Sequence, residues 1–287
     1  MFTQKLLAKL FCMFRLICLT KTYNLRDLEA WLKYHSKFIH CILLLDNESP
    51  VGDVEMRFLA DKYNAIYMPI AGFADQWALF GQILNKKTDI FIQNDDFVCF
   101  LDDDEYLYCS DNKNFENIVK AQFKQLDCIL LPEILMSTKH YQAKRNTVLP
   151  EFATYRRNDL SSQGKSIIWW NDWSEYSFNL HDEEKGHVPW INKRRYSDVV
   201  GSGVSKTTYG LTPKNLADQD LALIHYHIKS EDDWNMKIKR GSAATHSTET
   251  RQNGSYDNDI RKNIKFGGYD VQDFTMKRHF ETVINTV

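Results

Sequence analysis

The feature that most constrains the fold is a run of four carboxylates enclosed by two apolar segments, FVCFLDDDEYLYC at residues 97–109. The segment before the carboxylates, residues 97–101, is apolar throughout, as is typical of a short strand buried on both faces. Strands of that kind belong to parallel sheets covered by helices. The carboxylates that follow, Asp102, Asp103, Asp104 and Glu105, then lie at the C-terminal end of the strand, where open α/β sheets bind their ligands.

Four adjacent carboxylates repel one another, so a folded chain must neutralise them. Carboxylate oxygens suit a hard divalent cation such as Mg²⁺ or Mn²⁺, and an ion with few protein ligands keeps positions open for phosphate oxygens. We therefore interpret the run as an Asp-x-Asp site for a metal ion and a diphosphate. The alternative is an acidic, solvated turn that closes a hairpin.

The rest of the chain alternates between apolar strand-like runs and segments with helical periodicity. This alternation predicts an α/β fold made of right-handed βαβ units, with a doubly wound, mostly parallel central sheet flanked by helices. The expected strands are residues 14–20, 41–45, 65–68, 97–101 and 128–136, and the expected helices are 25–38, 54–63, 75–86 and 114–125. The 287 residues suit a single domain, which we divide into a first half (about 14–138), a less regular second half (about 139–241) and a C-terminal extension (242–287).

Charge and cysteine content exclude several functional classes. With 36 Lys and Arg against 38 Asp and Glu, nothing in the overall charge favours nucleic acid as a partner. The six Cys residues all lie in the first half and form no Cys-x-x-Cys pair, which indicates free thiols in a reducing compartment. Charged residues interrupt the apolar N-terminus before it reaches membrane-spanning length, so we expect no transmembrane segment and a cytoplasmic protein.

Four segments, in this order along the chain, together resemble glycosyltransferase family 92 and related family-2-like domains, which share the GT-A nucleotide-sugar fold. They are LTKTYNLRDLEAWLKYHSKFI (with Trp31 and His35), LLLDNES, FLDDDEY and IHYHIKSEDDWNMKIKRG. The middle of the chain departs from the family, because PEILMS at residues 132–137 stands where the family tends to carry an aromatic-Gly-Ser loop. The resemblance implies a GT-A (Rossmann-like) single catalytic domain, in which residues of about 14–138 bind the nucleotide sugar and those of about 139–241 complete the acceptor and metal sites. It further implies a metal-dependent, inverting glycosyltransferase. The enzyme would take a UDP- or GDP-linked sugar as donor and a glycan hydroxyl as acceptor.

The resemblance also implies a set of metal ligands. Asp104 is the leading candidate, and Asp102 either assists it or holds the ribose. The third ligand would come from the C-terminal motif, where His225 is best placed. The alternative for His225 is a core histidine on a strand beside Tyr226.

The nucleotide sugar would contact residues from several elements. Lys229 and Ser230 are expected at a helix N-terminus, where backbone N–H groups favour phosphate; the alternative for them is an ordinary solvated helix cap. Asp46 ends the second strand and is a candidate for the base or the ribose, although Asp46 and Asn47 are also good turn residues. Thr20, Gln76 and Asp103 complete the predicted donor site.

Inversion requires a carboxylate base that deprotonates the acceptor hydroxyl. Two candidates stay open: Glu133, in the apolar run CILLPEIL, and Asp172, among the tryptophans Trp169, Trp170 and Trp173, which could stack on an acceptor sugar. Two other functions compete with the transferase. One is a carboxylate-based glycoside hydrolase, and the other is a non-catalytic carbohydrate-binding domain.

Overall fold

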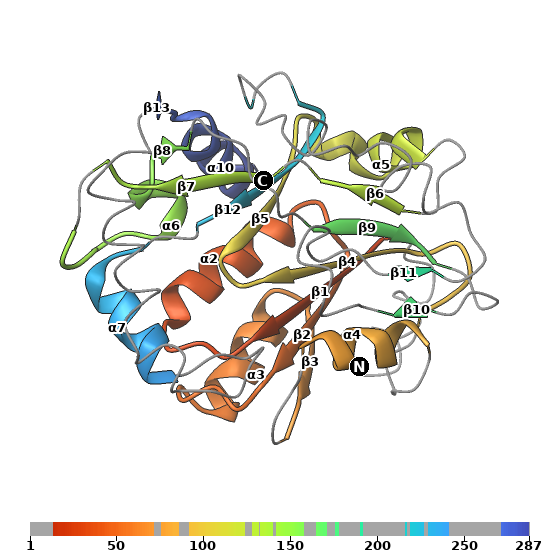
Figure 1. Ribbon diagram of the computed structural model, residues 1–287, viewed down its shortest axis with the longest axis horizontal. Coiled ribbons are helices and arrows are strands. Elements are labelled where there is room, and N and C mark those ends of the chain that lie inside the picture. Colours follow the sequence, from red (N-terminus) through yellow and green to blue (C-terminus); the bar gives the residue numbers. More distant parts are fainter. Residues whose placement is uncertain are drawn as a thin grey trace.

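A computed structural model describes thirteen stretches of the chain. They are residues 14–71, 76–85, 92–123, 128–131, 133–139, 142–157, 165–170, 176–177, 190–191, 216, 219–226, 229–240 and 271–286. Within these residues, helices flank a central sheet, and a second sheet stands beside it (Figure 1). The predicted α/β fold class is confirmed.

The central sheet has six strands, and its parallel part is built from the apolar runs of the first hundred residues. Its order is β3 (Ile66–Pro69), β2 (Cys41–Asp46), β1 (Phe14–Thr20), β4 (Phe97–Asp102), β9 (Ser166–Trp169) and β6 (Cys128–Leu130). The first four strands are parallel, whereas β9 runs antiparallel to both of its neighbours.

Both faces of this sheet are covered, which explains why its strands are apolar at successive positions. Alternate residues of β1 belong to two separate hydrophobic clusters, Leu16 and Cys18 to one and Ile17 and Leu19 to the other. The first cluster includes side chains of α2 (Leu25–His35), α3 (Asp53–Lys62), α5 (Phe115–Phe123) and α10 (Thr275–Asn285). The second includes those of α4 (Gln76–Leu84).

The second sheet has five strands, and the chain passes between the two sheets several times. Its order is β13 (Val271–Gln272), β8 (Tyr155–Arg156), β7 (Glu133–Ser137), β12 (Leu221–His225) and β5 (Glu105–Cys109). One crossing is the turn between β4 and β5, which consists of Asp103 and Asp104. Another crossing lies between β6 and β7, so the prediction of one continuous strand over 128–136 was wrong. The sequence carries a signal for an interruption here, because Pro132 lies within the run and proline cannot donate a ladder hydrogen bond.

Shorter elements complete the described chain. They are η1 (Asn112–Asn114), α6 (Leu149–Phe152), β10 (Tyr176–Ser177), β11 (Trp190–Ile191) and α7 (Glu231–Arg240). Helix α10 buries Met276 and Phe280 in the main hydrophobic cluster, so part of the predicted C-terminal extension belongs to the core. The division of the chain into halves and an extension stays a prediction.

Strand β5 is an edge strand, and side chains of helix α2 hydrogen bond to backbone groups along its free edge. The Trp31 indole donates to the Glu105 carbonyl (2.6 Å), and the Tyr34 hydroxyl donates to the Leu107 carbonyl (3.0 Å). His35 Nε2 accepts from the Leu107 N–H (3.1 Å), and burial lowers the pKa of this histidine to about 3, so the ring is neutral. The Trp-x-x-x-His pair of the sequence motif therefore fixes the strand that begins with Glu105.

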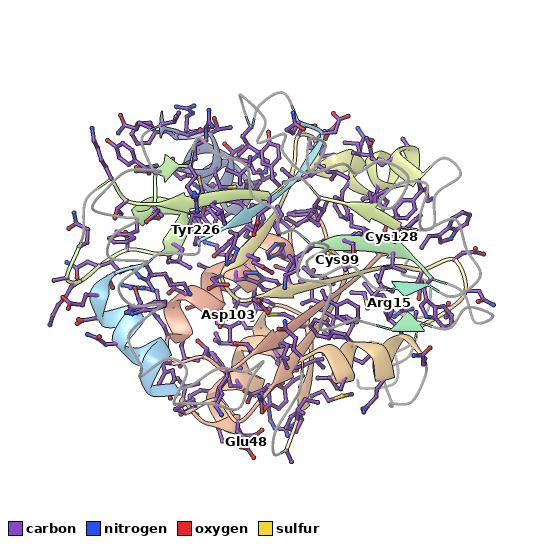
Figure 2. All side chains as sticks on the ribbon, in the orientation of Figure 1. Arg15, Glu48, Cys99, Asp103, Cys128 and Tyr226 are labelled. Carbon is purple, nitrogen blue, oxygen red and sulfur yellow. The ribbon has the colours of Figure 1, made fainter. Side chains whose placement is uncertain are left out.

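The described cysteines agree with the expectation of free thiols. Cys18, Cys41, Cys99, Cys109 and Cys128 are all buried and unpaired by disulfides. Cys99 and Cys128 lie among the strands of the central sheet in Figure 2. Among the described residues, no helix has the length and apolar character required to cross a membrane.

Candidate functional site

The turn between β4 and β5 lies at the C-terminal edge of the parallel strands, between the two sheets (Asp103 in Figure 2). In the strand register, Leu19 lies opposite Asp102 and Thr20 lies opposite Asp46. Three predicted site residues, Thr20, Asp46 and Asp102, therefore end neighbouring strands. This is the edge at which open α/β sheets bind ligands.

A buried lysine neutralises one side of the carboxylate turn. Lys165 is 1 % exposed, and its Nζ lies 3.4 Å from Asp102 Oδ2 and 3.3 Å from Glu105 Oε2. Gln76 donates to the other oxygen of Asp102 (2.8 Å). Burial opposes the charge of Lys165, but the two carboxylates outweigh it and raise the pKa of the ammonium. Burial also raises the pKa of Glu105, to about 7, against the effect of Lys165.

His225 lies on the other side of the turn, among three carboxylates. Its Nδ1 is 2.8 Å from Glu133 Oε1 and 3.9 Å from Glu105 Oε1, and its Nε2 is 3.9 Å from Asp104 Oδ1. Burial disfavours a charged ring, but the hydrogen bond to Glu133 and the neighbouring carboxylates raise the pKa of His225 to about 9.

The strand register explains why these side chains meet. Strand β12 lies between β5 and β7, and His225 is directly opposite Glu105 on β5. On β7, Glu133 is opposite Leu223, two residues before His225 and on the same face of the strand. Glu133 is thus the diagonal neighbour of His225, within reach of a side-chain contact.

Lys229 and Ser230 precede helix α7, as expected, but they differ in what they contact. Lys229 Nζ lies 2.9 Å from Asp104 Oδ2, and although burial opposes its charge, Asp104 and Asp103 raise the pKa of the ammonium. Ser230 forms a capping box with Asp233: its N–H and hydroxyl donate to the Asp233 carboxylate, and its hydroxyl accepts from the Asp233 N–H. Lys229 is therefore the cation of this segment that faces the turn.

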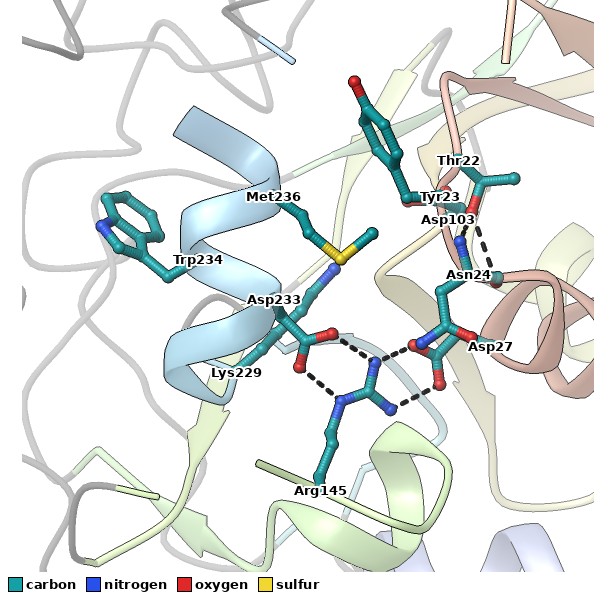
Figure 3. A pocket seen from close by; sticks show the side chains of 10 residues that line it. All are labelled: Thr22, Tyr23, Asn24, Asp27, Asp103, Arg145, Lys229, Asp233, Trp234 and Met236. Atoms are coloured by element: carbon teal, nitrogen blue, oxygen red, sulfur yellow. Dashed lines mark hydrogen bonds and ion pairs between the residues drawn. The ribbon is translucent and has the colours of Figure 1, made fainter. Parts of the chain in front are cut away.

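A pocket opens beside Asp103 and Lys229 (Figure 3). Its other lining residues come from the loop after β1, from α2 and α7, and from the segment before α6: Thr22, Tyr23, Asn24, Asp27, Arg145, Asp233, Trp234 and Met236. Arg145 forms ion pairs with both Asp27 on α2 and Asp233 on α7, which fixes one wall of the pocket.

Two further predicted site residues, Thr20 and Asp46, make hydrogen bonds within or next to the site. Thr20 donates to Asp103 (2.6 Å), so it holds the carboxylate turn. Asp46 accepts from the Ser49 N–H (3.0 Å) and the Tyr67 hydroxyl (2.9 Å), which gives it a role in its own turn. Asp172 lies outside the described residues.

Of the three tryptophans that could stack on a sugar, Trp170 is a core residue, and Trp173 lies outside the described residues. The Trp170 side chain is 1 % exposed, and its indole donates to the Leu84 carbonyl (2.8 Å). A ring buried in this way has no face available to a sugar. Trp169 is partly buried against the hydrophobic core.

The donor groups on the His225 side suit a divalent cation. Ligand atoms of Glu105, Glu133 and His225 lie within 4.8 Å of one another, and Asp104 approaches His225 from the other side. Carboxylate oxygens with an imidazole nitrogen fit Mn²⁺, and carboxylates fit Mg²⁺. Asp102, in contrast, is directed to Gln76 and Lys165.

Sequence reasoning missed Lys165 and Arg145. The only signal for Lys165 was a lysine at the start of the apolar run KSIIWW, and Arg145 lies in a polar segment without periodicity. Their importance comes from partners that are distant in the sequence.

The sequence matches no protein-family profile and no curated protein. Weak likenesses to solved structures are found. A 4-diphosphocytidyl-2C-methyl-D-erythritol synthase from Anaerococcus prevotii is 13 % identical, with a TM-score of 0.32 over 55 % of this chain and 70 % of that one. Glucosyl-3-phosphoglycerate synthase from Mycobacterium tuberculosis is 10 % identical, with a TM-score of 0.28 over 59 % of this chain and 61 % of that one. HddC from Yersinia pseudotuberculosis is 11 % identical, with a TM-score of 0.30 over 62 % and 92 %. At these sequence identities and TM-scores the likenesses give no evidence of function, so the functional argument rests on the residues of the site.

Proposed function

We propose that this protein is a metal-dependent glycosyltransferase of GT-A type. It would move a sugar from a UDP- or GDP-linked donor to a glycan hydroxyl, with inversion at the anomeric carbon. The observation that supports this most directly is that Asp103 and Lys229 line one pocket and that Lys229 Nζ lies 2.9 Å from Asp104 Oδ2. Anionic and cationic groups of this kind at one pocket suit a metal-bound diphosphate.

The chemistry requires that negative charge on the departing diphosphate be stabilised. A bound Mn²⁺ or Mg²⁺ supplies this stabilisation as a Lewis acid. Asp104 and His225 are the residues that would hold the ion. Lys229 has a fixed positive charge next to Asp104 and would contact the phosphates.

The pocket would accept the nucleoside of the donor. Tyr23 and Met236 give it apolar surface, and Asn24 offers an amide that can hydrogen bond to a base or ribose. Lys229 then stands between the nucleoside and the carboxylate turn. Gln76 and Thr20 act indirectly in this arrangement, because each donates a hydrogen bond to a carboxylate of the turn.

The base that deprotonates the acceptor would be a carboxylate. Asp172 keeps this role as a candidate. Glu133 contacts His225 rather than lining the pocket, so its carboxylate is not placed to act as this base.

Thermal unfolding with a panel of nucleoside diphosphates, each with and without Mn²⁺, tests the proposal. A ligand that binds only the native state stabilises it by RT ln(1 + [L]/Kd), about 2.7 kcal/mol at a concentration of 100 Kd. We expect UDP or GDP to raise Tm by several degrees only when Mn²⁺ is present. Asp104→Asn should abolish this shift, whereas the control Asp61→Asn, which neutralises an exposed carboxylate on α3, should keep it.

Two results would contradict the proposal. One is the absence of a shift with any nucleotide, and the other is an equal shift in the Asp104→Asn variant. If UDP or GDP instead produces the Mn²⁺-dependent shift, the next measurement is a transfer assay with the matching sugar nucleotides.

A further inference from the structure

Glu133 and His225 form a contact that the proposed reaction does not by itself explain. Glu133 is 9 % exposed and lies at the first residue of β7, immediately after the chain crosses between the sheets. Its Oε1 is 2.8 Å from His225 Nδ1, which is a hydrogen-bond distance. Glu133 is directed at His225 and does not line the pocket. Its carboxylate is therefore not oriented toward an acceptor hydroxyl bound there.

The two nitrogens of His225 face different groups. Nδ1 faces Glu133, whereas Nε2 faces Asp104 Oδ1 at 3.9 Å. The latter distance is too long for a hydrogen bond. It lies within the range of about 3.0–4.2 Å that separates two ligands of one ion with bonds of about 2.1 Å.

We propose that Glu133 is a positioning residue, which accepts a hydrogen bond from Nδ1–H of His225 and thereby presents Nε2 of the same ring to a cation shared with Asp104. Metal-ligating histidines generally donate their other ring N–H to a carboxylate or carbonyl, which fixes the tautomer and the orientation of the ring. The proposal rests on the metal-dependent function proposed above, and it removes Glu133 from the candidates for the catalytic base.

An alternative arrangement uses the same side chains. Glu105, Glu133 and His225 could all be direct ligands, because their ligand atoms lie within 4.8 Å of one another. The distance of 2.8 Å between Glu133 Oε1 and Nδ1 argues against direct ligation by both atoms, because it is shorter than the separation of about 3.0–4.2 Å between two ligands of one ion. Glu105 is also engaged elsewhere, because its Oε2 accepts from the Asp102 N–H (2.9 Å) and lies 3.3 Å from Lys165 Nζ.

The two arrangements predict different effects for two substitutions of Glu133. A glutamine keeps a carbonyl oxygen that can accept from Nδ1–H, but it is a poor replacement for an anionic metal ligand. An alanine removes both functions. If Glu133 positions His225, Glu133→Gln keeps Mn²⁺ affinity within a few-fold of the unaltered protein, whereas Glu133→Ala lowers it by about 10–100-fold.

The experiment is a Mn²⁺ titration monitored by electron paramagnetic resonance of the free ion, with the full chain and its Glu133→Gln, Glu133→Ala, Asp104→Asn and His225→Ala variants. Pulsed measurements on protein labelled with ¹⁵N-histidine report whether an imidazole nitrogen coordinates the ion. We expect the nitrogen signal to persist in Glu133→Gln and to be absent in His225→Ala. Thermal unfolding of each variant without metal serves as the control for folding.

An affinity of Glu133→Gln as low as that of Glu133→Ala would overturn the positioning role and make Glu133 a direct ligand, while leaving metal dependence intact. The absence of Mn²⁺ binding by the unaltered protein, with and without UDP or GDP, would instead overturn the metal-dependent function and the role of Glu133 with it. The two failures are thus distinguishable.

Discussion

Helices α2 and α7 approach the same carboxylate turn, but they are attached by different kinds of interaction. Helix α2 holds β5 with the uncharged side chains of Trp31, Tyr34 and His35, all fully buried. Helix α7 is attached through Arg145, which pairs with Asp233 on α7 and Asp27 on α2. The first contact lies within the core, and the second lines the pocket (Figure 3).

The difference indicates how the fold separates support from binding. The indole, the phenol and the neutral imidazole carry no net charge, so these contacts of α2 fix the backbone of β5 without placing a further charge beside the turn. Ion pairs next to a pocket set the charge that a ligand meets. We therefore expect α2 contacts to govern stability and α7 contacts to govern stability and ligand binding together.

The largest effect is expected from Trp31→Ala. Removal of a fully buried tryptophan costs about 3–5 kcal/mol, because a cavity is added to the loss of buried surface. The variant also leaves the Glu105 carbonyl without its indole partner. Urea denaturation measures the change, and Trp234→Ala, which removes the same side chain from a partly exposed position on α7, should cost about 1 kcal/mol. Equal costs would contradict the distinction between the helices.

The next effect is expected from Arg145→Met. The substitution keeps an apolar side chain of similar length but leaves the Asp27 and Asp233 carboxylates, both largely buried, without their guanidinium. Loss of one partner of a buried ion pair costs about 3–5 kcal/mol, and we expect about 2–4 here because Asp233 is 15 % exposed and can be partly hydrated.

The same variant should weaken nucleotide binding in the thermal-shift assay, because Arg145 lines the pocket. Arg57→Met, which breaks an exposed ion pair on α3, is the matched control and should change neither property measurably. Unaltered stability in Arg145→Met would show that the α7 attachment does not depend on this pair.

A smaller effect, about 2 kcal/mol, is expected on acidification from pH 7 to 5 and depends on His35. The pKa of His35 is about 3 in the folded protein and about 6.5 when unfolded, so the unfolded chain binds this proton first as the pH falls. Stability is therefore complete above pH 6.5 and is lost progressively down to pH 3. His35→Gln removes the titrating group, so the unaltered protein should lose about 2 kcal/mol more than this variant over the same pH interval.

The α7 contacts should respond in a different pH range. Burial opposes ionisation of Asp233, but Arg145 and Ser230 lower its pKa below the ordinary value of 3.8. A carboxylate with a lowered pKa contributes stability above its unfolded pKa and loses it only below that value. A difference between the unaltered protein and Arg145→Met that disappears between pH 7 and 5 would be inconsistent with this assignment.

The two regions also differ in how far the sequence predicted them. Strands β1, β2 and β4 were predictable, because burial on both faces makes nearly every residue apolar. The carboxylate turn was predictable as the end of such a strand. The change of sheet between β6 and β7 was not, because one apolar run supplies strands to two sheets and periodicity does not show to which sheet a strand belongs.

The charge partners were beyond sequence reasoning for a related reason. Lys165 meets Asp102 across 63 residues, and Arg145 meets Asp27 across 118. Apart from the apolar run that follows Lys165, nothing local distinguishes these two cations from the solvated lysines and arginines of the chain, because their burial results from the packing of distant elements. His225 and Lys229 were proposed from the sequence only through a motif.

The smallest predicted effect concerns salt and separates the α7 contacts from one another. Lys144 Nζ lies 3.7 Å from Asp232 Oδ2 on α7, and both side chains are exposed. The screening length falls from about 14 Å to about 4 Å between 0.05 and 0.5 M salt, so the coupling of this pair, about 0.5 kcal/mol or less at low salt, should vanish at high salt. A double-mutant cycle with Lys144→Met and Asp232→Asn at the two salt concentrations measures this coupling.

The stability cost of Arg145→Met should change much less with salt, because the Arg145 side chain is only 2 % exposed. The cost of His35→Gln should not change at all, because the buried imidazole is uncharged. If salt reduced the Arg145 and Lys144 contributions alike, the attachment of α7 would be a surface interaction, and its contrast with α2 would be one of burial rather than of charge.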